Sequence, residues 1–451
     1  MRAGFYSVDI TPRVGVGLCG FGPYLNRYSR AIRDTLKARA AAFEHKGERA
    51  IVVSCDLIGV TAELAAEMRE RAATATGVAS SKIMIHCTHT HSGPNTGGYI
   101  GWGEVDPPYI ALLPHKIASL CAGAVERLGE VTLHHAAAPC HGVGLNREYD
   151  KDAPPLEDVL EETWSPAKPE LTDTVTQVLA FRDSTGGLAG FMAYFGCHPV
   201  VCCEQTHYIH GDYCGVAMGN LEREYPGSVG MFLQGAQGDV NSCVVHKPEQ
   251  ESLLALDIIA ARFANAVRSG LKAAKPLEVE RLATVSNMTR FSSKDISLER
   301  IEALIKEQEA VIDAPGASDT DHKLRMAVVT LNGLRQIEQQ MRRGVDLSFQ
   351  EGEVQGVRVG PVVLLSAPFE IMQAIKNDVV GRARAQLPLV MGITNGSMGY
   401  APDKQAAARG GYAADIVPMI VGRLPYRDIH SELVEALLEA DRQLDGAPGG
   451  I

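Results

Sequence analysis

Apolar residues recur in two different patterns along the first part of the chain. Short apolar runs at residues 4–10, 50–55 and 83–85 predict strands, whereas the helical spacing of residues 61–76 and 109–128 predicts two helices. Strands that alternate with helices in this way predict a parallel or mixed sheet covered by helices.

The pattern changes in the middle of the chain. Apolar strands are predicted at residues 131–137, 175–181 and 188–194 without helices between them, so this part of the sheet is expected to be at least partly antiparallel. Further on, the pattern predicts helices at 213–223, 251–273 and 429–444 and strands at 230–235, 354–359, 362–366 and 387–393. Residues 298–343 predict two charged helices, which we interpret as a surface hairpin that carries no chemistry.

Composition excludes some classes of protein. Of the 451 residues, 45% are hydrophobic and 22% are charged, as in globular proteins, and the formal net charge of -11 argues against a nucleic-acid partner. No apolar run approaches the length needed to insert into a membrane, and the N-terminal segment lacks the apolar core of a secretory signal, which favours a cytoplasmic location. The ten cysteines form no CxxC pair and are expected to be small apolar core residues.

Three histidines lie close together after the predicted strand at 83–85. His86, His89 and His91 are followed by a Ser-Gly-Pro break, so the strand leads into a histidine-rich loop. In an extended segment residues two apart share a face, at a spacing of roughly 6.5 Å, so His89 and His91 can face one cavity. This spacing suits a metal ligand beside a helper, although an isolated pair of hydrogen-bonded loop histidines has the same pattern.

Other polar residues also follow predicted strands. His198 comes after the strand at 188–194, and Glu370 comes after the strand at 362–366, where it is expected to open a helix. Two histidines and one carboxylate with an open position form the ligand set of a catalytic zinc site. The local pattern does not choose among the histidines, because His86, His207 and His210 satisfy the same argument.

Two further residues have alternative interpretations at this stage. Asp56 ends the strand at 50–55, where an acid is well placed for a site or equally for a loop or helix cap. Arg147, in the segment GVGLNREY, can anchor a substrate carboxylate or carbonyl, or form a surface ion pair.

The sequence resembles the catalytic domain of the neutral, or alkaline non-lysosomal, ceramidase family over nearly its whole length. The segment THTHSGP at residues 88–94 is the most specific match. Matches at separated positions follow in order, namely a His-Pro and later Gly-Asp region, an Asn-Arg motif, a proline-containing turn before a glutamate, and an Asn-to-Tyr interval. The resemblance implies a layered α/β sandwich with zinc ligands at His89, His198, Glu370 and Tyr400, and active-site roles for His91, Arg147 and Tyr412.

The sequence also departs from the family pattern. The family's GDVSPN turn reads GDVNSC here, which puts Asn241 where a substrate-contacting serine is expected. The family's PGE reads PFE, and its tyrosine-rich EEYxxQxYE segment is much altered. The chain ends soon after the helix at 429–444, so residues 1–451 are predicted to form one catalytic domain without the family's C-terminal immunoglobulin-like domain. These departures point away from ceramide itself.

We therefore predict a zinc-dependent hydrolase that cleaves an amide bond of a soluble small molecule, such as an N-acyl compound or a cyclic amide. In this hypothesis His91 titrates near neutrality and passes a proton to the leaving nitrogen. The alternatives are a zinc-dependent esterase or lactonase, and a non-catalytic metal-binding relative. The helices at 298–343 can pack against another subunit, so a homo-oligomer is a further expectation.

Overall fold

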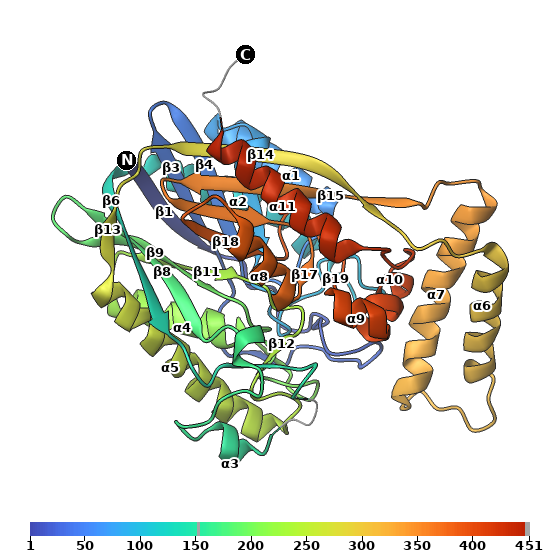
Figure 1. The fold of residues 1–451 in the computed structure, drawn as a ribbon. Coiled ribbons are helices and arrows are strands. Elements are labelled where there is room, and N and C mark those ends of the chain that lie inside the picture. The colour runs from blue at the N-terminus through green and yellow to red at the C-terminus, as the bar shows by residue number, and fades with distance from the viewer. Residues whose placement is uncertain (151–153, 447–451) are drawn as a thin grey trace.

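The computed structural model describes residues 1–150 and 154–446 as an α/β protein with two mixed sheets (Figure 1). The larger sheet has nine strands in the order β11-β9-β8-β6-β1-β3-β4-β5, with β13 paired to β6. Its neighbours are antiparallel except for the parallel pairs β11–β9 and β4–β5. The strands are β1 (Arg2–Asp9), β3 (Lys37–His45), β4 (Glu48–Cys55), β5 (Ile83–Cys87), β6 (Gly129–Pro139), β8 (Val175–Asp183), β9 (Leu188–Phe195), β11 (Val229–Gln234) and β13 (Lys275–Leu277).

The smaller sheet has four strands in the order β14-β15-β16-β18, of which β16 and β18 are parallel. Three short strand pairs, β2–β10, β7–β12 and β17–β19, lie outside both sheets. The bounds are β14 (Leu282–Ser292), β15 (Phe349–Val359), β16 (Val362–Ser366), β18 (Leu387–Met391), β2 (Ala31–Ile32), β10 (Tyr208–Ile209), β7 (Gly144–Asn146), β12 (Val240–Ser242), β17 (Glu370–Ile371) and β19 (Tyr400–Ala401).

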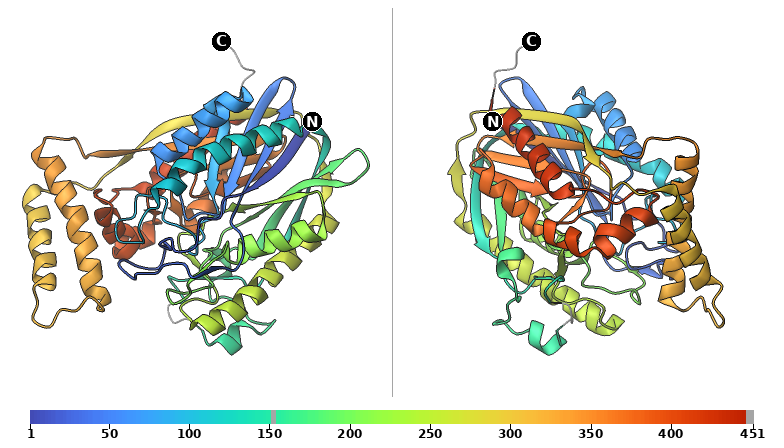
Figure 2. Two further views of the ribbon diagram at one scale, coloured as in Figure 1. Left: turned by 180° about the vertical axis from the view of Figure 1, so that it is seen from behind. Right: turned by 45° about the vertical axis from the view of Figure 1, so that its right-hand side comes forward.

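The two sheets face each other, and helices cover their outer faces (Figure 2). Apolar side chains of the larger sheet, such as Phe43 and Phe181, pack against Val357 and Leu364 of the smaller one. Four long helices cover the other face of the larger sheet, and two cover the smaller sheet. They are α1 (Ala62–Thr76), α2 (Pro107–Glu126), α4 (Asp212–Glu224) and α5 (Glu249–Ala273) on the larger sheet, and α8 (Gln373–Arg382) and α11 (Ile429–Asp445) on the smaller one.

Local sequence explains how these helices are bounded and oriented. In α1, the side chain of Thr61 accepts a hydrogen bond from the Leu64 N–H, and Gly77 ends the helix with a φ of 71°. The face of α1 that carries Leu64 and Met68 is buried against the larger sheet. The predicted layered α/β sandwich is confirmed.

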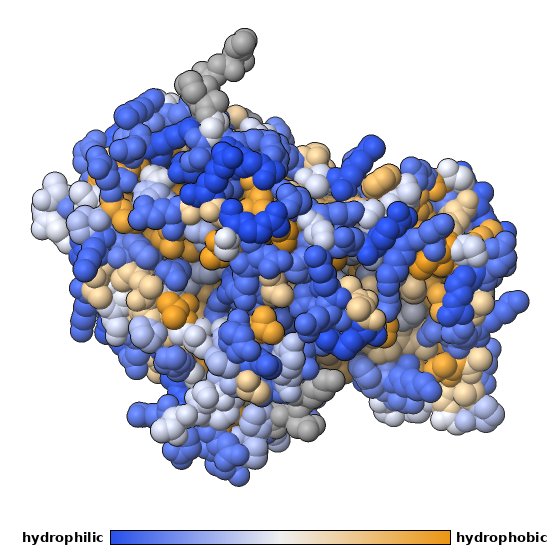
Figure 3. Space-filling view, in the orientation of Figure 1, coloured by the Kyte–Doolittle hydropathy of each residue, from blue (hydrophilic) through white to orange (hydrophobic). Residues whose placement is uncertain are grey.

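A helical hairpin is inserted between two paired strands. Strands β14 and β15 are antiparallel along their whole length, and the chain between them forms α6 (Leu298–Ile312) and α7 (His322–Arg342), at the right in Figure 1. In the same orientation, Figure 3 shows a mainly hydrophilic surface with apolar residues on the hairpin and in the hollow beside it. Shorter helical segments are α3 (Leu156–Val159), α9 (Lys404–Arg409), α10 (Val417–Ile420), two 3₁₀ turns (Ser80–Lys82 and Pro169–Leu171) and a π-helical turn (Tyr412–Ile416).

Three strands of the sandwich, namely β3, β14 and the three-residue β13, are absent from the sequence-based prediction. Strand β3 reads KARAAAFEH, and its buried alanines favour helix rather than strand by intrinsic propensity. Strand β14 reads LATVSNMTRFS, and most of its side chains are partly or fully exposed. Neither β3 nor β14 has the apolar run that marks a buried strand, and β13 is too short to show one. The ten cysteines are all buried, as predicted for core residues. No helix in residues 1–150 and 154–446 is long and apolar enough to cross a membrane.

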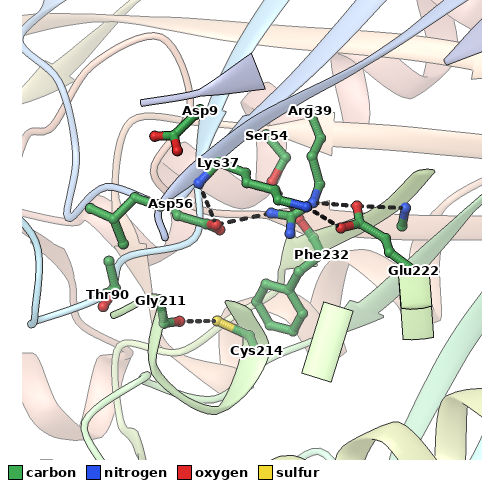
Figure 4. A network of polar contacts seen from close by, with 12 residues as sticks. Asp9, Lys37, Arg39, Ser54, Asp56, Thr90, Gly211, Cys214, Glu222 and Phe232 are labelled. Atoms are coloured by element: carbon green, nitrogen blue, oxygen red, sulfur yellow. Dashed lines mark hydrogen bonds and ion pairs between the residues drawn. The ribbon is translucent and has the colours of Figure 1, made fainter. Parts of the chain in front are cut away.

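Asp56 belongs to a buried ionic network rather than to a cavity (Figure 4). Its Oδ2 accepts hydrogen bonds from Nη1 of Arg39 at 2.9 Å and from the Lys37 N–H at 3.0 Å. Glu222 of α4 binds Nε of Arg39 at 2.9 Å and Nζ of Lys37 at 2.7 Å. The network joins β3 and β4 to α4, and Asp56 and Arg39 are almost wholly buried. Of the two interpretations of Asp56, the structural one fits this placement.

Replacing Arg39 with methionine is expected to lower the free energy of unfolding by about 3–5 kcal/mol, because it leaves the buried Asp56 carboxylate without its counter-charge. Denaturant unfolding followed by circular dichroism measures this change. The matched control is Arg71→Met, which breaks the exposed pair with Glu67 and is expected to cost less than about 1 kcal/mol. Equal effects of the two substitutions would contradict a stabilising role for the network.

Candidate active site

Strand ends from both sheets meet at one edge of the sandwich. His89 follows β5 and His198 follows β9 in the larger sheet, whereas Glu370 follows β16 in the smaller one. The two sheets are linked there, since the Cys87 N–H donates to the Ile393 carbonyl at 3.1 Å and His86 bridges to Thr394. Residues far apart in the sequence are thereby brought to a common site.

Glu370 does not open a helix, contrary to the sequence-based prediction. Glu370 and Ile371 form the short strand β17, which pairs in parallel with β19 so that Glu370 lies opposite Tyr400. Helix α8 begins only at Gln373. The cause is the segment that leads into β19, because the carbonyl of its Gly399 accepts a hydrogen bond from the Glu370 N–H at 2.9 Å. In a first helical turn this N–H would be left free.

His89, His198 and Glu370 converge in the interior. Nε2 of His198 lies 2.9 Å from Oε2 of Glu370, and Nε2 of His89 lies 3.5 Å from the same oxygen. The opposite ring nitrogens are held by backbone carbonyls, with Nδ1 of His89 at 2.5 Å from Ile58 O and Nδ1 of His198 at 2.5 Å from Gln237 O. When Nδ1 carries the proton, Nε2 keeps its lone pair, which is how metal-binding histidines are usually oriented.

The charges of this group also suit a cation. Burial by itself raises the pKa of Glu370, but the neighbouring His89 and His198 rings hold that pKa well below its usual range, so the carboxylate stays ionised. Burial lowers the pKa of His198, which favours the neutral ring that a metal requires. His89 adopts a φ of 72°, a conformation that is uncommon for residues other than glycine and is typical of functional sites. The donor set therefore fits a divalent ion such as zinc.

His91 lies beside this group with no partner of its own. Its ring centroid is 4.9 Å from that of His89 and 5.8 Å from that of His198, and neither of its ring nitrogens has a hydrogen-bond partner. Burial and the two neighbouring rings lower its pKa well below the ordinary value. This differs from the expectation that His91 titrates near neutrality, because the sequence does not reveal the crowding of three rings.

The N-terminal loop at residues 11–36 holds His91, which the sequence analysis did not anticipate. Nη1 of the buried Arg27 donates to the His91 carbonyl at 2.6 Å, and the Phe21 ring packs edge-on against the His91 ring at 5.2 Å. A Cβ on Gly20 would lie 2.4 Å from Cγ of His91, so only glycine permits this approach. A Cys-Gly-Phe-Gly segment with two glycines is the only signal in the sequence.

Two tyrosines and Arg147 lie together next to Glu370, which pairs with Tyr400 between β17 and β19. The Tyr400 and Tyr412 rings are 6.0 Å apart, with Tyr400 buried and Tyr412 48% exposed. Cζ of Arg147 lies 5.1 Å from the Tyr400 ring centroid, and its Nη2 donates to the Gly238 carbonyl at 2.6 Å. Burial raises the pKa of the Tyr400 phenol, and the Arg147 guanidinium opposes that change. Arg147 therefore lies against Tyr400 and does not form the alternative surface ion pair.

The remaining predicted residues lie outside this group. His86 uses both ring nitrogens, since Nε2 accepts from the Gln234 N–H and Nδ1 faces the Gly392 carbonyl. His207 binds the Tyr28 carbonyl instead. Asn241 is in β12, one residue after Val240, whose carbonyl accepts the His198 N–H, but it is not among the described residues that line the cavity.

A second trio, Cys202, His210 and Asp212, is also close enough together to hold an ion. Nδ1 of His210 accepts from the Asp212 N–H at 3.1 Å, so in the neutral ring the proton lies on Nε2 and blocks that atom as a ligand. Asp212 accepts from the Tyr213 N–H at 2.7 Å, and the nearby Arg27 guanidinium disfavours a further positive charge. We interpret this trio as support for the loop before α4.

A cavity of about 610 Å³ opens from the histidines. His89, His91, Glu370, Tyr400 and Tyr412 line one part of it. The other walls combine apolar and charged side chains, none of which the sequence analysis anticipated. The apolar ones are Ile58, Val60, Trp102, Met398, Val417 and Ile420. The charged ones are Glu63, Arg69, Glu351, Glu353 and Arg423.

The fold and site define a class of α/β sandwich proteins with two histidines and a carboxylate at the edge of a cavity, and sequence comparison identifies the family. Residues 2–252 match the family described as neutral/alkaline non-lysosomal ceramidase, N-terminal. The chain therefore belongs to the neutral/alkaline non-lysosomal ceramidase family, which is a family of amide hydrolases. No curated protein sequence matches the chain.

Solved structures agree with this assignment at the level of the fold. The neutral ceramidase from Pseudomonas aeruginosa superposes with a TM-score of 0.72 at 18% sequence identity, covering 100% of this chain and 76% of that one. A ceramidase complexed with C2 gives a TM-score of 0.73 at 18% identity, covering 98% of this chain and 75% of that one. At this identity the similarity establishes the ceramidase-like fold, and the resemblance inferred from THTHSGP is confirmed.

Proposed function

We propose that this protein is a zinc-dependent hydrolase that cleaves an amide bond of a soluble small molecule, an N-acyl compound or a cyclic amide. The observation that carries the proposal is the convergence of Nε2 of His89 and Nε2 of His198 on the Glu370 carboxylate at the edge of the cavity. Membership of an amidase family favours an amide over an ester as the substrate.

His89, His198 and Glu370 would hold the ion, with the Tyr400 phenol as a fourth candidate ligand. When bound, zinc supplies Lewis-acid chemistry, lowering the pKa of water to about 7 and polarising a carbonyl group. The Ile58 and Gln237 carbonyls fix the proton on Nδ1 of each histidine and so keep the two Nε2 atoms available. Because Tyr400 lies opposite Glu370 in the β17–β19 pair, the two side chains keep one relative position.

His91 is proposed to move the proton. Neither of its ring nitrogens has another partner, so one of them can accept a proton from the attacking water and then donate it to the leaving nitrogen. The same group thus serves as base in the first step and as acid in the second. The Arg27 hydrogen bond to the His91 carbonyl and the Phe21 contact keep the ring oriented for both steps.

Hydrogen-bond donors are needed to stabilise the negative charge that develops on the substrate carbonyl oxygen. Tyr412 lines the cavity and is accessible enough to contact a substrate, so its hydroxyl is proposed to donate to this oxygen. Arg147 lies beneath Tyr400 and is proposed to act through it, by stabilising negative charge on that phenol. Asn241 does not line the cavity among the described residues, so its contact with the substrate stays a prediction from the sequence.

The proposal is tested by metal analysis and a substrate panel. The purified protein is expected to contain about one equivalent of zinc, to lose turnover when a chelator removes it, and to regain turnover when zinc is restored. Short N-acyl amides, cyclic amides, esters and lactones are then compared. A preparation without a divalent ion whose activity resists chelation would refute metal-dependent hydrolysis, and turnover of esters or lactones alone would favour the esterase alternative.

A further inference from the structure

We propose that Arg423 forms a carboxylate-binding subsite in the cavity, so that preferred substrates are small amides with an anionic group away from the bond that is cleaved. The expectation that the substrates are amides rests on the proposed function, whereas the subsite itself does not depend on it. Arg423 lines the same cavity as His89, His91 and Glu370, and it is the C-terminal neighbour of the turn after α10.

Arg423 has an unused donor. Its Nη1 atom is buried and makes no hydrogen bond, and no carboxylate of the described chain lies within ion-pair distance of its guanidinium. Its side-chain neighbour is the Tyr426 phenol, which is neutral at pH 7 because burial raises the pKa of that phenol to about 12. A buried guanidinium N–H without a partner is costly, and a carboxylate is the group that best satisfies it, through two parallel hydrogen bonds.

The other charged residues of the cavity are mostly paired among themselves. Nη1 of Arg69 binds Oε2 of Glu353 at 2.6 Å, and the Ser286 hydroxyl donates to the other oxygen of Glu353 at 2.6 Å. Glu351 pairs with Arg290 at 2.9 Å on the exposed side. These groups have satisfied partners, so a ligand gains little by replacing them.

Glu63 is the one remaining acid in the lining. It lies in the first turn of α1, where its own backbone N–H and the Thr61 hydroxyl lower its pKa. Arg423 lowers that pKa further from a distance, without an ion pair between them. Glu63 therefore weakens the field of Arg423 but does not occupy its donors.

The helical hairpin holds Arg423 in place. A Cβ on Gly333 of α7 would lie 1.8 Å from the Met419 carbonyl oxygen, so the backbone of α10 rests directly on α7. Gly422 then turns the chain with a φ of 71°, and the Arg423 N–H donates to the Pro418 carbonyl at 2.9 Å. This packing orients Arg423 before any ligand arrives, which reduces the entropy cost of binding. The hairpin thus supports the proposed subsite through packing, and the interpretation that it carries no chemistry of its own stays a prediction.

Apolar side chains also line the cavity that Arg423 shares with the histidines and Glu370. Trp102, Met398 and Ile420 are buried residues of this lining, and they suit the methylene groups of a short acyl chain. The chain as a whole has a formal net charge of -11 and so repels anions at long range. A preference for an anionic substrate must therefore come from a local cation such as Arg423.

The test is direct binding. Monohydroxamates of dicarboxylic acids, in a series of chain lengths, are compared with methyl-terminated hydroxamates of equal length by isothermal titration calorimetry. The wild-type protein is expected to bind the best carboxylate-terminated probe about tenfold more tightly than its methyl-terminated counterpart. Arg423→Met is expected to abolish this preference, and Arg423→Lys is expected to retain part of it.

Two further variants make the result specific to Arg423. Arg427→Met removes an exposed guanidinium from the same segment and is expected to leave the preference unchanged. Glu63→Gln removes the opposing charge and is expected to strengthen it. Equal binding of both probes by wild-type protein whose zinc content has been measured, no binding of either probe by that zinc-containing protein, or an unchanged preference in Arg423→Met would each overturn the subsite.

The binding test separates this inference from the proposed function. Absence of amide turnover together with a carboxylate preference that depends on Arg423 would refute the function and keep the subsite. Turnover of neutral and anionic amides at equal rates, together with equal probe binding, would keep the function and refute the subsite.

Discussion

Replacing His198 with alanine is expected to abolish stoichiometric zinc binding and to lower kcat by about 1,000-fold or more. The loss follows from the geometry, because Nε2 of His198 lies 2.9 Å from the Glu370 carboxylate, closer than Nε2 of His89. The other ring nitrogen of His198, Nδ1, is already held by the Gln237 carbonyl. Metal catalysis contributes several kcal/mol, and each 1.36 kcal/mol corresponds to about a tenfold change in rate. Elemental analysis of the purified variant and its steady-state kinetics measure both effects.

His207→Ala is the matched control for this prediction. His207 belongs to the same histidine-rich segment but binds the Tyr28 carbonyl at 2.9 Å and is not among the described residues that line the cavity. The control is expected to keep its zinc and its activity. Zinc that stays bound to His198→Ala at full occupancy would show that this histidine is not a ligand.

Replacing His91 with asparagine is expected to lower kcat by about 100-fold to 10,000-fold while zinc content stays intact. The reason is that His91 lies beside the ligand group without a hydrogen bond to Glu370, and its free ring nitrogens face the site in neutral form. Kinetics and elemental analysis on one preparation separate the two roles. In addition, the variant is expected to lose the acidic limb of the pH–rate profile that belongs to this base.

The opposite outcome has a structural meaning. Nitrogen atoms of His89, His91 and His198 lie within 4.8 Å of one another, so the three rings are close enough to form a ligand set of their own. Loss of zinc from His91→Asn would therefore move His91 into the ligand group. In that event the proton would need another carrier, and Tyr412 is the exposed candidate in the cavity.

Much of the sandwich was predictable because its buried strands are apolar runs. Strands β4, β5 and β16 are buried along most of their length, and such segments are recognisable without knowledge of their neighbours. Strand β3 was missed because buried alanines look like helix, and β17 was missed because a strand of two residues exists only through its pairing with β19. The pairing of strands depends on contacts between residues far apart in the sequence, which the local pattern of apolar residues does not reveal.

The candidate site divides in the same way. THTHSGP marks His89 and His91 locally, and the family resemblance supplied His198, Glu370 and Tyr400 as predictions. Gly20, Phe21 and Arg27 could not be predicted, because a loop near the N-terminus meets the histidines only after the sheet has formed. Arg423 was hidden for a similar reason, since an arginine after a glycine turn gives no sign that one of its nitrogens is buried without a partner.

The position of the hairpin between β14 and β15 has a consequence for how such a protein diversifies. The inserted segment begins and ends on strands that stay paired along their whole length, so its length and sequence can change without shifting the register of either sheet. His89, His198 and Glu370, the residues proposed to hold the metal, follow strands of the sandwich, whereas the turn that carries Arg423 rests on the hairpin. If both proposals hold, reaction type and substrate preference are encoded by separate parts of the chain, and exchanging hairpins among relatives is expected to change selectivity on an unchanged catalytic frame.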